Sequence, residues 1–283
     1  MPELRLWGGP LDGLSLQYAV QGRGPVVALV HGLGGFAASW GATMEALSGR
    51  ATVLALDLPG FGRSAKPRVR YGLSLFTEAL DGFLDGLGVG QVSLVGHSLG
   101  ASVVLTYALA HPGRVDRLAL VAGLVPGFPY RLSPIYRALA LPGVGEALAL
   151  CGCQAVYRAA LARCFYRPRA EAIEFLVNCD YAARTGWGAR AAYLSAVRAV
   201  RDDFAAMGPD CRRALRALTA PMLMIQGRQD PVVPAAHGHA VAQELPRVEV
   251  RWVEACGHFP QIEHSDQVNG WLSEFLVARP APR

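Results

Sequence analysis

The chain has 283 residues, of which 52% are hydrophobic and 17% charged, as in a globular protein with a sizeable buried core. Its formal net charge is +5, but its arginines form no run of five and are not interleaved with aromatic residues, which disfavours nucleic-acid binding. Residues 1–10 hold no apolar stretch long enough for a signal sequence, and the charge-free stretches 24–44 and 86–113 are broken by glycines. We therefore expect a cytoplasmic protein without an integral membrane segment.

Strand-like and helix-like segments alternate along the chain. An early antiparallel strand is expected at 14–20, followed by buried strands at 26–30, 53–56, 91–95, 115–121, 222–226 and 248–253. Helices are expected at 36–47, 75–87, 101–110 and 267–277. This alternation predicts an α/β protein with a mostly parallel sheet covered by helices on both faces.

The alternation stops between residues 122 and 221, which contain no clear strand and are rich in alanine, leucine and arginine. We predict that residues 124–216 form a helical cap inserted into a core made of residues 1–123 and 217–283. Such an insertion is long enough to cover the carboxyl edge of the sheet, where α/β proteins bind ligands. Residues 124–220 hold 13 arginines and 7 acidic residues. A solvated helical surface explains this excess, although a basic field also attracts anionic substrates or membrane surfaces.

The six cysteines show no C-x-x-C spacing, and five of them lie in a region without histidine. We expect reduced thiols in the core, no metal site and no cofactor. Surface or capping roles are expected for four of the histidines, at positions 111, 237, 239 and 264.

The stretch Gly96-His97-Ser98-Leu99-Gly100 lies where an apolar strand turns directly into an apolar helix. Such a junction needs a tight, strained corner, and glycines on both sides of the serine remove the Cβ atoms that would clash there. The pattern G-x-S-x-G in this context predicts a nucleophile elbow, with the Ser98 hydroxyl held above the sheet at the start of a helix.

A serine hydroxyl needs a base to act as a nucleophile at neutral pH. His258 is the best candidate, because it follows the last strand in a loop that Gly257 allows to reach over the sheet edge. Asp230, directly after the strand 222–226, can orient the imidazole. No carboxylate follows the strand 115–121, so Asp230 is the sole candidate for the acid.

An oxyanion formed at Ser98 would need hydrogen-bond donors. We expect them to be the backbone N–H groups of Leu99 and of Leu33, the latter in the glycine-rich loop after the strand 26–30. His31 in the same loop is expected to hydrogen-bond the loop rather than act in catalysis. Three aromatic residues of the predicted cap are candidate substrate-binding residues: Phe128, Tyr130 and Trp187.

Together these residues resemble the α/β-hydrolase superfamily of serine hydrolases, including its capped esterase-like and carbon–carbon hydrolase-like branches. The likeness covers residues 14–278 and also includes the loop 57–64, to which we assign an architectural role. It implies an eight-stranded sheet and the chain order Ser98, Asp230, His258 for nucleophile, acid and base. Serine in the elbow separates the chain from the haloalkane dehalogenase and epoxide hydrolase branches, which carry aspartate there.

The resemblance predicts a carboxylic ester hydrolase acting on a small molecule through an acyl-enzyme. A carbon–carbon hydrolase of ring-cleavage dienoate products is the first alternative, because the basic cap suits an anionic substrate. In the relatives of that kind, asparagine or glycine often precedes the serine, where this chain has His97. A perhydrolase or lyase with the same triad, and a non-catalytic receptor on the same scaffold, are the further alternatives. The oligomeric state is not indicated.

Overall fold

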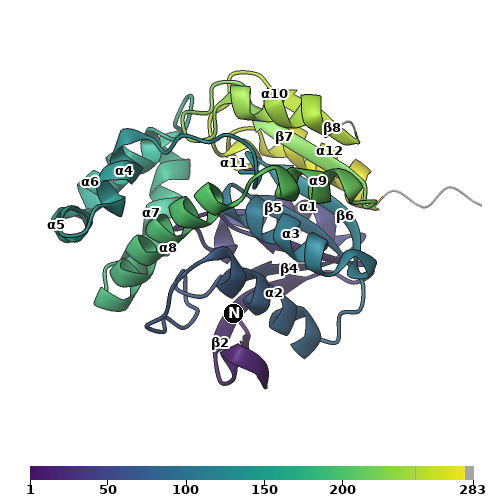
Figure 1. Cartoon of the computed structure of the whole chain (residues 1–283), viewed down its shortest axis with the longest axis horizontal. Coiled ribbons are helices and arrows are strands. Elements are labelled where there is room, and N and C mark those ends of the chain that lie inside the picture. Colours follow the sequence, from purple (N-terminus) through teal and green to yellow (C-terminus); the bar gives the residue numbers. More distant parts are fainter. Residues whose placement is uncertain (246, 278–283) are drawn as a thin grey trace, which may run out of the picture.

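A computed structural model describes residues 1–245 and 247–277, and its centre is one eight-stranded sheet (Figure 1). The strands lie in the order β1-β2-β4-β3-β5-β6-β7-β8. They comprise β1 (Glu3–Arg5), β2 (Ser15–Gln21), β3 (Val26–Val30), β4 (Thr52–Leu56), β5 (Val92–His97), β6 (Val115–Val121), β7 (Met222–Gly227) and β8 (Val248–Val253). Strand β2 pairs antiparallel with β1 and β4, and all other neighbours pair in parallel. The predicted sheet is therefore confirmed.

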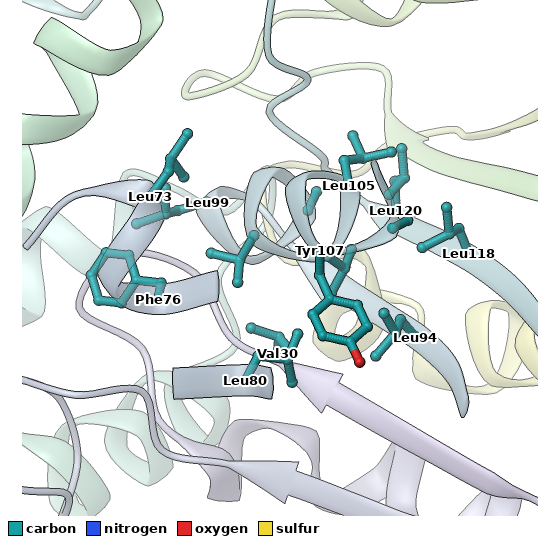
Figure 2. Packing of buried hydrophobic residues seen from close by; sticks show 14 of the residues in the cluster. Val30, Leu73, Phe76, Leu80, Leu94, Leu99, Leu105, Tyr107, Leu118 and Leu120 are labelled. Carbon is teal, nitrogen blue, oxygen red and sulfur yellow. The ribbon is translucent and has the colours of Figure 1, made fainter. Parts of the chain in front are cut away.

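Helices cover both faces of this sheet and bury two separate apolar layers. Helices α1 (Gly41–Ser48) and α12 (Ser265–Val277) pack on one face, where Val27 and Leu29 of β3 point. Helices α2 (Leu73–Gly86) and α3 (Leu99–Ala110) pack on the other, against Ala28 and Val30. Figure 2 shows this second layer, with Tyr107 lying between α3 and the strands. Because both faces of the sheet are buried, β3 is apolar at every position, and this pattern allowed the strand to be predicted from the sequence.

The first strand and the first helix differ from the sequence prediction. The short edge strand β1 was not predicted, since three residues carry too little pattern to be recognised. The helix expected at 36–47 is divided into a 3₁₀ turn, Ala37–Trp40, and helix α1. The buried carboxylate of Asp57 accepts a hydrogen bond of 2.6 Å from the N–H of Ala37 and so anchors that first turn.

The chain between β6 and β7 contains only helices. They are α4 (Pro134–Ala140), α5 (Val144–Cys151), α6 (Gln154–Ala162), α7 (Ala170–Arg184), α8 (Trp187–Ala206) and α9 (Pro209–Ala217). Helices α4 to α7 lie together beside the carboxyl ends of the strands (Figure 1). The absence of strands here agrees with the expectation for a cap, whereas the division into domains at 124–216 stays a prediction. Among the described residues, no helix has the length and apolar character to span a bilayer.

The predictions for the cysteines and for one histidine were wrong in part. Only Cys256 is buried, while the cysteines at positions 151, 153 and 179 are exposed, because they lie in the helical segment between β6 and β7 and not in the core around the sheet. His237 is buried, although helix α10 (Ala235–Glu244) carries it on a largely polar segment. Its Nε2 accepts a hydrogen bond from Val125 N–H at 3.1 Å and its Nδ1 lies 3.1 Å from the Pro129 carbonyl. His237 thus ties α10 to the chain leaving β6.

Candidate active site

Ser98 occupies the corner between β5 and α3 in a strained conformation, with φ 52° and ψ −117°. A Cβ at Gly96 would lie 2.5 Å from Ala101 N, and one at Gly100 would lie 2.6 Å from the His31 carbonyl oxygen. Only glycine fits at both positions, because backbone atoms cannot move aside as side chains do. The strain, of the order of 1–3 kcal/mol, is maintained by the surrounding packing and raises the hydroxyl above the strand ends.

His258 and Asp230 form a buried pair. The Nδ1 of His258 lies 2.8 Å from Asp230 Oδ2, and both side chains are almost fully shielded from solvent. The other carboxylate oxygen, Oδ1, accepts backbone N–H bonds from Val232 at 2.7 Å and Val233 at 2.9 Å. Since the carboxylate is held at both oxygens, it fixes the imidazole with Nδ1 protonated and leaves Nε2 to accept a proton.

The two backbone amides expected to stabilise an oxyanion lie beside Ser98. Leu99 is the first residue of α3, where N–H groups lack helical partners, and Leu33 lies in the loop after β3. Neither N–H has a hydrogen-bond acceptor within the part of the chain that is described. Leu33, Ser98, Leu99 and His258 all line one cavity. The amides are thus available to a negatively charged oxygen formed there.

His31 holds the glycine-rich loop after β3 in place, as expected. Its Nδ1 donates to the carbonyl of Gly32 at 2.7 Å, and its Nε2 accepts from Leu58 N–H at 3.0 Å. Both bonds are satisfied by one neutral tautomer. Burial lowers the pKa of His31, against the opposing effect of Asp57, and so keeps the ring uncharged.

His97, between the glycine and the serine of the elbow, contacts the loop that carries His258. Its Nε2 donates to the backbone carbonyl of His258 at 2.7 Å, and its ring stacks on Phe259 at 5.1 Å. Burial lowers the pKa of His97 well below 6.5, and the neighbouring His258 lowers it further. The ring is therefore a neutral donor that positions the loop carrying His258.

The segment after α6 also holds the backbone of His258. The N–H of His258 donates to the carbonyl of Cys164, two residues beyond the end of α6, at 2.7 Å. The next cap residue, Phe165, stacks on Phe259 with ring centroids 4.9 Å apart. These contacts make the segment after α6 part of the site, which the sequence did not indicate.

The cavity around Ser98 has a volume of about 190 Å³ and is bounded by the core below and cap helices above. Of the three predicted substrate-binding residues, the structure places only Tyr130 on its wall. Phe128 is buried in the main core beside His237. Trp187 is 76% exposed and lines a different hollow, between α5 and α8, because it begins α8 on the outer side of the cap.

A cluster that the sequence analysis missed lines the roof of the cavity. Arg184 lies 3.2 Å from the buried carboxylate of Asp180, four residues earlier on α7. Its guanidinium also lies over the ring of Tyr157 at 4.3 Å and near that of Tyr193 at 5.4 Å. Burial raises the pKa of Asp180, while Arg184 opposes that shift. Arg184, the one arginine that lines the cavity within the described part of the chain, is thus paired with an acid.

An eight-stranded α/β sheet, a strained serine at a strand–helix corner and a histidine–aspartate pair across the same edge define a protein of the hydrolase class. The sequence pattern described as the alpha/beta hydrolase family matches residues 27–271. The chain belongs to this family.

Relatives of this chain include hydrolases of ring-cleavage products. It is 30% identical over 268 residues to a 2-hydroxymuconate semialdehyde hydrolase of Pseudomonas putida, covering 92% of this chain and 90% of the relative. The structure of 2-hydroxy-6-oxo-6-phenylhexa-2,4-dienoate hydrolase from Rhodococcus sp. strain RHA1 aligns with a TM-score of 0.84 and 26% identity, over 98% and 99% of the two chains. An esterase from Thermogutta terrifontis shares the fold, with a TM-score of 0.80 and 23% identity over 97% of each chain.

Proposed function

We propose that this hydrolase cleaves carboxylic esters of small molecules through an acyl-enzyme. Ser98 Oγ attacks the carbonyl carbon while His258 Nε2 takes its proton, and Asp230 stabilises the imidazolium. The N–H groups of Leu33 and Leu99 bind the oxyanion, and His258 returns the proton to the departing alkoxide. Water then attacks the acyl carbonyl with the same assistance and releases the acid and free Ser98.

The observation that carries the ester proposal is the absence of an uncompensated cation on the described wall of the cavity. Arg184 is paired with Asp180, and the buried rings of His31 and His97 have lowered pKa values. The remaining wall is mainly apolar and aromatic, with Tyr130 bonded to the Val232 carbonyl at 3.2 Å. Such a wall fits a neutral substrate better than a carboxylate, which needs a charged partner when buried.

A carbon–carbon hydrolase is the second candidate. Relatives at about 30% identity bear names of that activity, and Arg184 would bind a dienoate carboxylate if substrate displaced it from Asp180. The same serine, histidine and oxyanion amides would serve this reaction, so the catalytic groups do not separate the candidates. The choice depends on the charge of the cavity roof.

The deciding experiment compares kcat/KM for p-nitrophenyl esters, from acetate to palmitate, with that for a 2-hydroxy-6-oxo-dienoate. We expect ester turnover to exceed dienoate cleavage, and Ser98→Ala to abolish both without loss of folding. A double variant, Asp180→Asn with Arg184→Gln, removes both charges so that neither remains buried alone. The double variant should still hydrolyse esters. If the parent protein instead prefers the dienoate, and the double variant no longer cleaves it, the second candidate would be established.

A fluorophosphonate tests the catalytic serine independently of substrate choice. It should label Ser98 covalently and leave the Ser98→Ala variant unlabelled. An unreactive Ser98 in folded protein would reject the catalytic proposal and favour a receptor on this scaffold.

A further inference from the structure

Exposed apolar side chains are concentrated in the cap. Of 13 large hydrophobic side chains that are exposed in the described structure, nine lie between residues 135 and 187. They are Ile135, Leu141, Val144, Leu148, Leu150, Val156, Tyr166, Phe175 and Trp187. Scattered apolar residues on a surface need no explanation, but a concentration of this kind marks an interaction site.

Helix α5 has no covering partner on most of its circumference. Its sequence, VGEALALC, has one charged residue, Glu146, and its only buried residue is Gly145. A helix that is apolar nearly all round is normally enclosed within a protein or a membrane. Figure 1 shows α5 at the edge of the cap farthest from the sheet.

Three exposed side chains from neighbouring helices form what we call the cap tip: Leu150, Val156 and Trp187. Leu150 and Trp187 line a hollow between α5 and α8, which Ala149 and Arg190 also line. Val156 lines a second hollow that shares Ala149 and Arg190 with the first. The cap tip is therefore a continuous surface, with a cationic side chain between its apolar ones.

The second hollow adjoins the cavity of Ser98. The two share five lining residues, Gly34, Tyr157, Ala160, Arg184 and Tyr193. The cap tip thus lies at the outer end of a series of hollows that ends at Ser98. A partner that covers the cap tip would control which molecules enter these hollows and reach Ser98.

The charge around the cap tip favours an anionic occupant. The two hollows are lined by more cationic than acidic residues: Lys66, Arg70, Arg184, Arg190 and Arg198 against Glu146, Asp180 and Asp202. Arg190 makes no ion pair with any acidic residue that the structure describes. A second copy of the chain, docked by the same surface, would bring these arginines face to face and be repelled. Exposed tryptophan and leucine among arginines are instead the composition that binds the interface of an anionic bilayer.

We propose that the cap tip docks on an anionic lipid surface. Trp187 and Leu150 enter the boundary between headgroups and acyl chains, and Arg190 faces the lipid phosphates. The apolar side chains supply binding that is independent of salt, while the arginines supply selectivity for anionic lipid. Docking in this way places the outer hollow against the membrane, from which an apolar ester would reach Ser98.

The test measures co-sedimentation with vesicles, using the full chain carrying Ser98→Ala so that hydrolysis of lipid plays no part. Vesicles contain phosphatidylcholine alone or with an equal part of phosphatidylglycerol. We expect binding to the anionic vesicles that weakens with added salt, and little binding to phosphatidylcholine. Trp187→Ser should weaken binding by at least about tenfold, the effect of losing one buried aromatic side chain, and Arg190→Gln by about fivefold.

Trp7→Ser is the matched control, because Trp7 is 82% exposed but lies outside the cap. It should bind like the parent protein, and thermal unfolding should show that all variants fold. Absence of binding to anionic vesicles, or binding that Trp187→Ser leaves unchanged, would overturn the proposal. So would light scattering that shows a dimer separated by Trp187→Ser, since the tip would then be a protein interface. Each result stands whether or not the protein proves to be an esterase.

Discussion

Replacing Asp230 by asparagine changes one atom and should nearly abolish turnover. Oδ1 accepts the N–H groups of Val232 and Val233, so an asparagine must place its carbonyl oxygen there. Its NH₂ group then occupies the position of Oδ2, facing His258 Nδ1 and Gln226 Nε2, which lie 2.8 and 3.1 Å from it. A donor at this position forces His258 into the tautomer with Nε2 protonated, which cannot accept the serine proton.

The expected loss of kcat follows from the contacts that the Asp230→Asn variant keeps. The two backbone N–H bonds survive, so the fold should be retained, while the base is held in the wrong tautomer. In serine hydrolases this exchange lowers kcat about 10⁴-fold, equivalent to about 5.5 kcal/mol of transition-state stabilisation. The oxyanion amides of Leu33 and Leu99 are untouched and should support a residual rate.

The assay is kcat for a short p-nitrophenyl ester, with thermal unfolding as the check on folding. Asp116→Asn, an exposed aspartate on β6, is the matched control and should keep the parent rate. A folded Asp230→Asn variant with less than a tenfold loss of kcat would refute the inference that Asp230 sets the tautomer.

Two further predictions concern stability. Burial lowers the pKa values of His31, His97 and His237, so below pH 6.5 the unfolded chain binds more protons than the native one, and stability must fall as the pH drops. Urea unfolding should show a loss of up to about 1.4 kcal/mol per pH unit for each ring; a free energy of unfolding constant from pH 7 to 5 would contradict this. Gly100→Ala should cost about 3 kcal/mol or prevent folding, because the added Cβ meets backbone oxygens. Ala101→Gly, the reverse exchange at the next residue, is the control and should cost only about 1 kcal/mol. Equal losses of stability for the two variants in thermal unfolding would show that the corner is not close-packed.

The strands and the elbow could be predicted because their physical causes are local. A strand buried on both faces must be apolar throughout, and a serine at a strand–helix corner must be flanked by glycines. Asp230 and His258 were found in a similar way, because each lies in the loop that follows a predicted strand, Asp230 after β7 and His258 after β8. The structure places them 2.8 Å apart.

The surroundings of the residues between β6 and β7 could not be predicted from the sequence. They depend on how these helices pack against the core and not on the local sequence pattern. Asp180 and Arg184 are four residues apart, a spacing that the sequence does show. The same spacing occurs on solvated helices, so nothing in it indicates burial beside Ser98. For Trp187 the prediction was wrong in the opposite direction. This large aromatic residue was expected to line the substrate cavity, but it lies on the exposed surface of the protein.

The contact between Cys164 and His258 limits which part of the cap can move. Separating them would leave the N–H of His258 without its acceptor, at a cost of about 1–3 kcal/mol in a buried site, and would disturb the base. Helix α5 has one buried residue and therefore opens at far lower cost. We expect hydrogen exchange to be fast in α5 and slow at the His258 amide, so that the tip can admit substrate while the base stays in place. Equal exchange rates at the two positions would mean that the cap opens as one body and carries the base with it.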